Sequence, residues 1–172
     1  MLKRPEKNEY PDYYVPYVDL VPEDGLLQLL KENLQKTVSL FDNISEEEGL
    51  HCYAPGKWSI KEVLGHITDT ERIMSYRLLR VARGDQTPLA GFNENDYVQA
   101  AQTNNLSLKT ILEDFKATRN ATISLIQNIP AQAWENTGNA NGMAITTRAI
   151  AYIIAGHQMH HCKIVEERYL KK

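Results

Sequence analysis

The fold is decided by residues 59–78, SIKEVLGHITDTERIMSYRL. Apolar residues recur there every three or four positions, which is the spacing of one face of an α-helix. The first four residues, Ser59 to Glu62, match the capping box, in which serine and glutamate side chains satisfy backbone N–H groups at a helix start. The stretch therefore predicts an amphipathic helix that begins at Ser59 and ends near Gly84.

Three other stretches have the same helical spacing of apolar residues. They run from about Glu23 to Phe41, from Ser107 to the stop at Pro130, and from about Thr147 to Leu170. Together with residues 59–84 they predict an all-α protein built as a four-helix bundle.

The segments between these helices carry weaker signals. The long connection 84–106 is expected to hold a short helix near Glu94–Ala100. No stretch alternates between apolar and polar residues, so no strand is predicted. The pair Asn141-Gly142 is assigned to a polar loop just before the last helix.

Residues 1–22 are rich in proline and tyrosine. Proline removes backbone donors and disfavours helical geometry in the residue before it, so this segment is predicted to contain no helix. The tyrosines indicate an extended arm that lies against the domain. The predicted organisation is an extended N-terminal arm over residues 1–22 and a bundle over residues 23–172.

Length and composition point to an ordinary globular protein. The chain has 172 residues, of which 42% are hydrophobic and 24% charged, and a net charge of −3. No basic stripe or long apolar run is present, so we expect no nucleic-acid or membrane partner. The first residues lack a secretory signal, and Cys52 and Cys162 form no metal or redox motif. We therefore expect a cytoplasmic protein with reduced thiols that acts on a small molecule.

The last predicted helix carries Gly156-His157-Gln158-Met159-His160-His161. At helical spacing, His157 and His161 lie within the apolar stripe that faces the bundle core, one turn apart on the same face. Two imidazoles so placed can bind a single metal ion. The competing interpretation is a hydrogen-bonded structural pair within the core.

Two further histidines, His160 and His66, are candidate ligands for the same site. His160 lies at the edge of the stripe and is the less favoured ligand. His66 lies on the flank of its own helix and becomes a candidate because the pair needs a third donor from a facing helix. The zincin motif requires a glutamate directly after the first histidine, and Gln158 at that position argues against a thermolysin-type protease.

Two segments carry a resemblance to a known family. The run from Pro55 to Glu71, PGKWSIKEVLGHITDTE, resembles the second-helix signature of the DinB-like (YfiT-like) superfamily, and residues 156–161 resemble its last-helix signature. The N-terminal arm is similar to the opening of one branch of that family. The resemblance implies an up-down-down-up four-helix bundle with a divalent metal ion held by His66, His157 and His161.

The same resemblance sets the functional expectations. Zinc, nickel, iron or manganese would suit the site, and homodimers are common in the family. The leading expectation is a metal-dependent enzyme, specifically an S-transferase that uses a low-molecular-weight thiol as cosubstrate. A metal-dependent hydrolase is one alternative, and a metal-binding stress or scaffold protein without turnover is another. Asp69, three residues after His66, is a candidate for orienting an imidazole or a bound water molecule.

Overall fold

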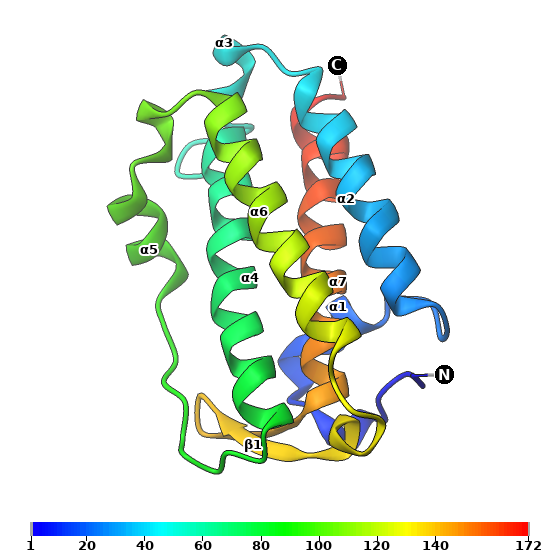
Figure 1. Cartoon of the computed structure of the whole chain (residues 1–172). Coiled ribbons are helices and arrows are strands. Elements are labelled where there is room, and N and C mark those ends of the chain that lie inside the picture. The colour runs from blue at the N-terminus through cyan, green and yellow to red at the C-terminus, as the bar shows by residue number, and fades with distance from the viewer. Residues whose placement is uncertain (1, 172) are drawn as a thin grey trace.

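The computed structural model describes residues 2–171. Its body consists of four long helices: α2 (Leu26–Asp42), α4 (Ile60–Ala82), α6 (Leu108–Gln127) and α7 (Thr147–Ile164). The colours in Figure 1 show that α2 and α7 run in one direction and that α4 and α6 run in the opposite one. This up-down-down-up order confirms the predicted all-α four-helix bundle.

Side-chain caps define where α4, α6 and α7 begin, whereas α2 begins after Gly25 without one. The Ser59 hydroxyl accepts a hydrogen bond from the backbone N–H of Glu62, whose carboxylate accepts one from the N–H of Ser59 at 2.8 Å. This is the predicted capping box. Ser107 and Thr146 cap α6 and α7 through backbone N–H groups three residues further on. At its other end α7 continues into one turn of π-helix, Val165–Tyr169.

Short helices fill the connections. The predicted helix near residues 94–100 is present as α5 (Glu94–Ala101), which lies outside the bundle beside α4 in Figure 1. A 3₁₀-helix (Thr103–Asn105) follows it, and a β-carbon added at Gly65 of α4 would lie 2.6 Å from the Thr103 side chain. This connection therefore packs tightly on α4. Two further short helices are α3 (Glu46–Gly49) and a 3₁₀-helix at Ala131–Glu135.

The prediction that residues 137–146 form a loop without strands is wrong. Strands β1 (Thr137–Ala140) and β2 (Met143–Thr146) pair as an antiparallel hairpin below the bundle. Its turn residues Asn141 and Gly142 both have positive φ, at 54° and 77°. An Asn-Gly pair with two positive φ angles matches the right-handed twist of a two-residue hairpin. The local turn chemistry therefore determines this hairpin even though its strands lack an alternating pattern.

The N-terminal arm contains helical turns that the sequence interpretation excluded. They are two 3₁₀-helices, Lys7–Glu9 and Asp12–Tyr14, and the single-turn helix α1 (Val15–Val18). Pro16 falls in the first turn of α1, where the N–H that proline lacks would have no helical partner in any case. The arm is thus compact where it meets the bundle and not extended throughout.

The core is divided by a layer of polar side chains. One group of buried apolar residues includes Met74, Ile123 and Ile154, and the other includes Ile67, Phe115 and Val165. Buried polar residues lie at or within about one turn of the junction between these two groups on every long helix: Asn33 and Thr37 on α2, His66 and Glu71 on α4, Arg119 on α6, and His157 and Gln158 on α7. Buried polar groups are costly unless they find partners, so this layer is where a function is to be sought.

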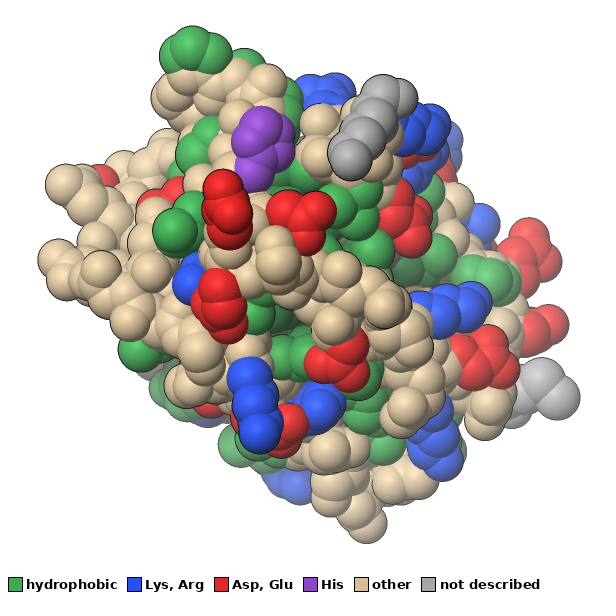
Figure 2. Space-filling model, turned by 90° about the horizontal axis from the view of Figure 1, so that it is seen from above, with side chains coloured by type: hydrophobic (Ala, Val, Ile, Leu, Met, Phe, Trp, Pro, Cys, Tyr) green, Lys and Arg blue, Asp and Glu red, His purple; other side chains and the backbone are tan. Residues whose placement is uncertain are grey.

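At the end of the bundle that carries α3, the described surface is not dominated by one type of side chain. Figure 2, viewed onto that end, shows acidic, basic and apolar side chains intermixed. No helix within residues 2–171 has both the length and the apolar character needed to cross a membrane.

Candidate metal centre

Three histidines from two helices converge in the polar layer. His66 extends from α4, and His157 and His161 extend from successive turns of α7. One ring nitrogen of each lies within 4.8 Å of the corresponding nitrogen of the other two. The closest pair is His66 Nε2 and His157 Nε2, which are 3.0 Å apart.

The cluster is shielded from water. His66 is 4% exposed and His157 6% exposed, and His161 is partly buried. Burial lowers the pKa of His66 to about 4 and that of His161 to about 3, and it holds the pKa of His157 well below its ordinary value. Desolvation disfavours the charged form of an imidazole. All three rings are therefore neutral at pH 7, the state in which histidine binds metals.

The structure places His66 more centrally than helical periodicity did. Its helix, α4, contacts α6, α7 and α5, so more than one of its faces is covered. The Trp58 ring lies over His66 with ring centroids 4.7 Å apart. His66 therefore lies in the interior of the protein, although it is on the flank of the apolar stripe of its own helix.

Tyr17 of the arm is a neighbour of the cluster that sequence reasoning missed. Its ring meets His157 edge-on at 5.4 Å and His160 at 5.2 Å between centroids. The arm comes this close because residue 156 is glycine: a β-carbon there would lie 2.0 Å from the Tyr17 carbonyl oxygen. The glycine directly before His157 was the available signal, since such a residue inside a helix marks a close approach of another backbone.

His160 lies outside the group of converging nitrogens. It is partly exposed and contacts Tyr17 and the edge of the His161 ring. Burial lowers the pKa of His160 as well. Because it is adjacent to His161 on the helix, its side chain projects in a different direction from the His157–His161 face.

Gln158 and Cys162 face α2. The Gln158 amide donates to the Thr37 hydroxyl at 2.7 Å and to the Cys162 sulfur at 3.2 Å. Burial raises the pKa of Cys162, so its thiol is protonated at neutral pH. These residues form a separate polar contact between α7 and α2.

Asp69 lies beside charged side chains of the α4–α6 face. Its carboxylate pairs with Arg72 at 3.6 Å, and Arg72 forms a bidentate pair with Asp114. Burial raises the pKa of Asp69. Within residues 2–171 no hydrogen bond joins Asp69 to any of the three histidines.

A small pocket opens onto His161. Its volume is about 250 Å³, and aromatic and apolar side chains form most of its lining, among them Tyr53, Trp58, Val63, Ile164 and Tyr169. The Tyr169 hydroxyl donates to the Trp58 carbonyl oxygen at 2.7 Å, so the π-helical turn closes one side. The cluster is thus buried but can be reached by a small molecule.

The donor set fits a divalent metal ion. In the part of the chain described, the single hydrogen-bond contact made by the three rings is the one between His66 and His157. Tetrahedral coordination at zinc–nitrogen distances of about 2.0–2.1 Å puts ligand nitrogens about 3.4 Å apart. The observed separations, from 3.0 Å to at most 4.8 Å, need small side-chain adjustments only.

An ion pair occupies the same layer beside the histidines. Arg119 of α6 donates from Nε and Nη2 to the two carboxylate oxygens of Glu71, each at 2.7 Å. Arg119 has no exposed surface and Glu71 is 3% exposed. Glu71 is therefore a buried ion-pair partner of Arg119.

Comparisons with known proteins agree with this geometry. No curated protein matches the chain in sequence. In fold it is similar to YfiT from Bacillus subtilis, described as "a probable metal-dependent hydrolase with an unusual four-helix bundle topology", at a TM-score of 0.76 and 14% identity, over 96% of this chain and 91% of that one.

A second solved structure is similar over the bundle. It is a mycothiol-dependent maleylpyruvate isomerase, at a TM-score of 0.69 and 13% identity, and the match covers 85% of this chain but 61% of that one. At such identities these likenesses concern the fold. A family model for the DinB superfamily matches residues 29–165. That match covers most of α2, all of α4, α6 and α7 and the three converging histidines, and the chain belongs to the DinB superfamily.

Proposed function

We propose that the chain is a metal-dependent enzyme that binds one divalent ion through His66, His157 and His161. The observation that carries this proposal is the convergence of three neutral imidazoles within 4.8 Å in a shielded layer that offers them no carboxylate partner among residues 2–171. Structural histidine clusters are normally satisfied by protein hydrogen bonds. Three neutral ligands also leave a coordination position for a reactant.

The reaction we propose is transfer of a low-molecular-weight thiol to an electrophilic small molecule. A divalent ion held by His66, His157 and His161 would lower the pKa of a bound thiol or water molecule and so supply a nucleophile at neutral pH. Trp58, Val63 and Ile164 form an apolar pocket at His161 that would exclude water from a bound thiol. The likeness to a mycothiol-dependent enzyme adds support.

Hydrolysis is the second candidate. The observation that favours it is the likeness in fold to YfiT, described as a probable metal-dependent hydrolase. The three histidines would hold the ion in the same way for either reaction. The two reactions differ in which nucleophile occupies the pocket at His161.

The metal site is tested first, on untagged protein. Near-stoichiometric zinc, nickel, iron or manganese should be measured by elemental analysis and should be lost in His157→Ala and His161→Ala. His160→Ala is the matched control, because it removes an imidazole from the same helix but outside the converging group, and it should retain metal. Protein that stays metal-free after reconstitution with each ion would overturn the proposal.

The reaction is tested by two parallel assays on the loaded protein. One measures conjugation of bacillithiol, glutathione or coenzyme A to a chloro-nitro-aromatic acceptor, and the other measures hydrolysis of model esters and amides. Thiol-dependent product that the His66, His157 and His161 triple-alanine variant does not form supports the transferase. Hydrolysis without any thiol effect would replace it with the second candidate. Loaded metal with no turnover in either assay would favour a non-catalytic metal-binding protein.

Assembly and compartment are part of the same proposal. We propose a homodimer, to be checked by light scattering on the purified chain. We also propose a reducing, cytoplasmic environment. The free thiols of Cys52 and Cys162, the first of them exposed, support this because exposed thiols persist where disulfides do not form.

A further inference from the structure

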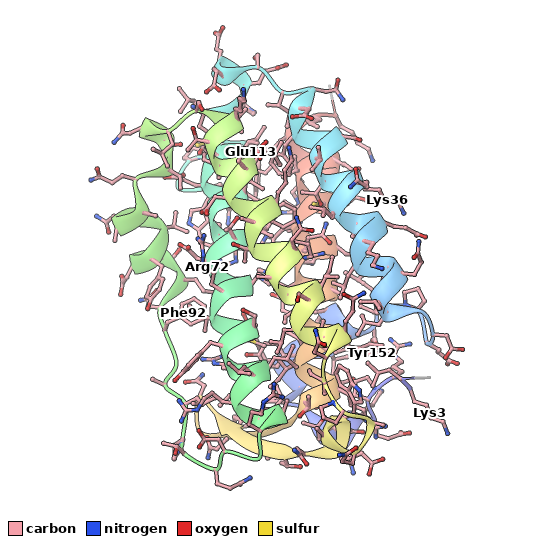
Figure 3. The ribbon with its side chains drawn as sticks, in the orientation of Figure 1. Lys3, Lys36, Arg72, Phe92, Glu113 and Tyr152 are labelled. Atoms are coloured by element: carbon pink, nitrogen blue, oxygen red, sulfur yellow. The ribbon has the colours of Figure 1, made fainter. Side chains whose placement is uncertain are left out.

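A second and larger cavity lies between the arm, α4 and the hairpin. Its volume is about 460 Å³, and its lining includes Tyr14, Arg77, Phe92, Glu94, Asn95 and Asn141. Phe92, labelled in Figure 3, lies on the connection that runs beside α4 below α5. Neither the proposed metal ligands nor the pocket at His161 accounts for this cavity.

Arg77 is the charged group built into its wall. The residue is 3% exposed, yet no carboxylate within residues 2–171 lies within 4.0 Å of it. Its guanidinium donates to the Ala90 carbonyl oxygen at 2.6 Å and to the Met74 sulfur, a poor acceptor, at 3.4 Å. It also lies 6.0 Å from the centroid of the Phe92 ring and within hydrogen-bonding reach of the Tyr14 hydroxyl, and both of these residues line the cavity. A guanidinium has five N–H donors, so donors are left over for a ligand in the cavity.

Arg119 is a second buried arginine of this chain, and its role is structural. Its guanidinium is neutralised by the two carboxylate oxygens of Glu71. Arg77 has a comparable degree of burial without such a partner. Since an unpaired buried cation is costly, its retention beside a cavity points to an anion from outside the chain.

The remaining walls are preformed. Leu89 pairs with the hairpin through two backbone hydrogen bonds, of 2.9 Å to Asn139 and 2.8 Å from Asn141. Gly91 lies so close to the turn that an added β-carbon would be 2.1 Å from the Asn141 side-chain oxygen. The loop before α5 is therefore clamped onto the hairpin, and the cavity keeps its shape without a ligand.

We infer that this cavity binds a carboxylate group of an elongated small-molecule substrate through Arg77. The inference rests on the proposed function, because it places the reactive end of that substrate at the histidine cluster. Asn95 lines both this cavity and the pocket at His161, so the two are neighbours. Arg77 follows His66 by eleven residues on α4, which corresponds to about 16 Å along a helix. The substrate class is a carboxylate extended over a similar length.

Glu94 is the one acidic residue in the cavity lining and supports the rival assignment, a site for amines. Burial raises the pKa of Glu94. It forms no ion pair with Arg77 at 4.0 Å or less in the described part of the chain, so the arginine keeps its charge for a ligand. The experiment must therefore compare an anion with a cation of the same length.

The test is a ¹H–¹⁵N NMR titration of the full chain with succinate, with 1,4-diaminobutane and with the uncharged succinamide. It is performed with and without Zn²⁺. Succinate should shift the Arg77 side-chain Nε–H and the amides of Phe92 and Asn95, and the other two probes should not. Arg77→Met should weaken succinate binding by about tenfold or more, the loss expected for a charge-assisted hydrogen bond.

Two variants serve as controls. Arg80→Met removes a charge from the next turn of the same helix, where Arg80 pairs with Asp85 at the surface, and it should leave succinate binding unchanged. Arg77→Lys keeps the charge and should retain part of the affinity. If Arg77→Met does not fold, the wild-type Arg77 Nε–H shift decides alone.

Several results would overturn the assignment: no Arg77 shift with succinate, equal shifts with succinamide, or tighter binding of the diamine that is lost in Glu94→Gln. The titration does not depend on turnover. If the protein holds metal but succinate does not bind at Arg77, the carboxylate site is refuted and the proposed function stands. A protein that holds no metal but binds succinate at Arg77 would refute the proposed function instead.

Discussion

Two buried polar clusters share one layer of the bundle and differ in how they are satisfied. The Glu71–Arg119 pair joins α4 to α6, and both carboxylate oxygens accept from the guanidinium at 2.7 Å. The three histidines join α4 to α7, with one hydrogen-bond contact among them. The first cluster is complete within the protein, whereas in the second several ring nitrogen atoms have no hydrogen-bond partner among residues 2–171.

That difference separates structure from function. A buried ion pair with all its partners in place holds two helices in register and needs nothing from solution. Neutral imidazoles that converge without protein partners have their lone pairs available for an ion. The comparison therefore predicts that perturbing the first cluster changes stability, and that perturbing the second changes what the protein binds.

The largest effect is expected from breaking the ion pair. Glu71→Ala leaves Arg119 charged and unpaired in the core, so the free energy of unfolding should fall by about 3–5 kcal/mol. Urea denaturation measures this. The double variant Glu71→Met, Arg119→Met removes both charges and should recover most of the loss. A single variant as stable as the wild type would show that the pair does not hold the helices together.

Acid should destabilise the metal-free protein through the histidines. Burial lowers the pKa of His66 to about 4 and that of His161 to about 3, so between about pH 6.5 and these values the unfolded chain binds more protons than the folded one. The contribution of these histidines to stability is then fully present above pH 6.5 and is lost as the pH drops toward 3, a loss of several kcal/mol because each pKa unit of difference corresponds to about 1.4 kcal/mol.

The measurement is urea denaturation of EDTA-treated protein at a series of pH values. His66→Phe removes one buried imidazole and should show a shallower loss over the same range. An unchanged slope in that variant would mean that other groups cause the acid sensitivity.

Removal of the metal should lower stability by a similar or smaller amount. If the ion binds the folded state alone, saturation at about one hundred times its dissociation constant stabilises by about 3 kcal/mol. The thermal midpoint should therefore fall on chelation in the wild type and in the Glu71→Met, Arg119→Met double variant. It should not change on chelation of His157→Ala. Equal sensitivity of His157→Ala and wild type to the chelator would contradict the assigned ligands.

The arm covers the histidine cluster and not the ion pair, and Gly156 is what permits this. A β-carbon at position 156 would lie 2.0 Å from the Tyr17 carbonyl, so Gly156→Ala should push α1 off α7 at a cost of about 1–3 kcal/mol. Limited proteolysis should then cut the arm faster than in the wild type. Arm cleavage at the wild-type rate would show that the contact tolerates the added methyl group.

The smallest effect is expected at Asp69. Its side chain is about one-third exposed and pairs with Arg72. Asp69→Asn should therefore change the free energy of unfolding by less than about 1 kcal/mol and leave metal affinity unchanged. Competition titration with a chromophoric chelator measures that affinity. A clear loss of affinity in Asp69→Asn would restore Asp69 as a residue that orients a ligand.

Part of the site follows from local sequence alone. His157 and His161 are one turn apart within an apolar stripe, so helical geometry is sufficient to bring their rings together. His66 shows the limit of that reasoning: periodicity places it on a flank, and the family resemblance was what made it a candidate. The packing of α4 against several elements then puts it 3.0 Å from His157.

Local signals were also misjudged in two places. The Asn141-Gly142 pair determines the hairpin through its two positive φ angles, although the flanking strands lack alternation. The prolines of residues 1–22 predict that the arm contains no helix. Pro16 nevertheless lies in the first turn of α1, where proline is tolerated. In both cases the position of the residue decides its effect. The Asn-Gly pair forms the turn of a hairpin, and the proline is accommodated because it lies at the start of a helix and not in its interior.

By itself the sequence determined the four helices, the capped start of α4 at Ser59 and the facing pair on the last helix, because these depend on interactions between residues three or four positions apart. The tertiary structure alone decided which buried charges are paired. Glu71 pairs with Arg119, forty-eight residues away, whereas Arg77 has no carboxylate within 4.0 Å in the described part of the chain and faces a cavity lined in part by the hairpin. Such pairings depend on how helices pack across the bundle, and no local spacing encodes the distance between side chains on different helices.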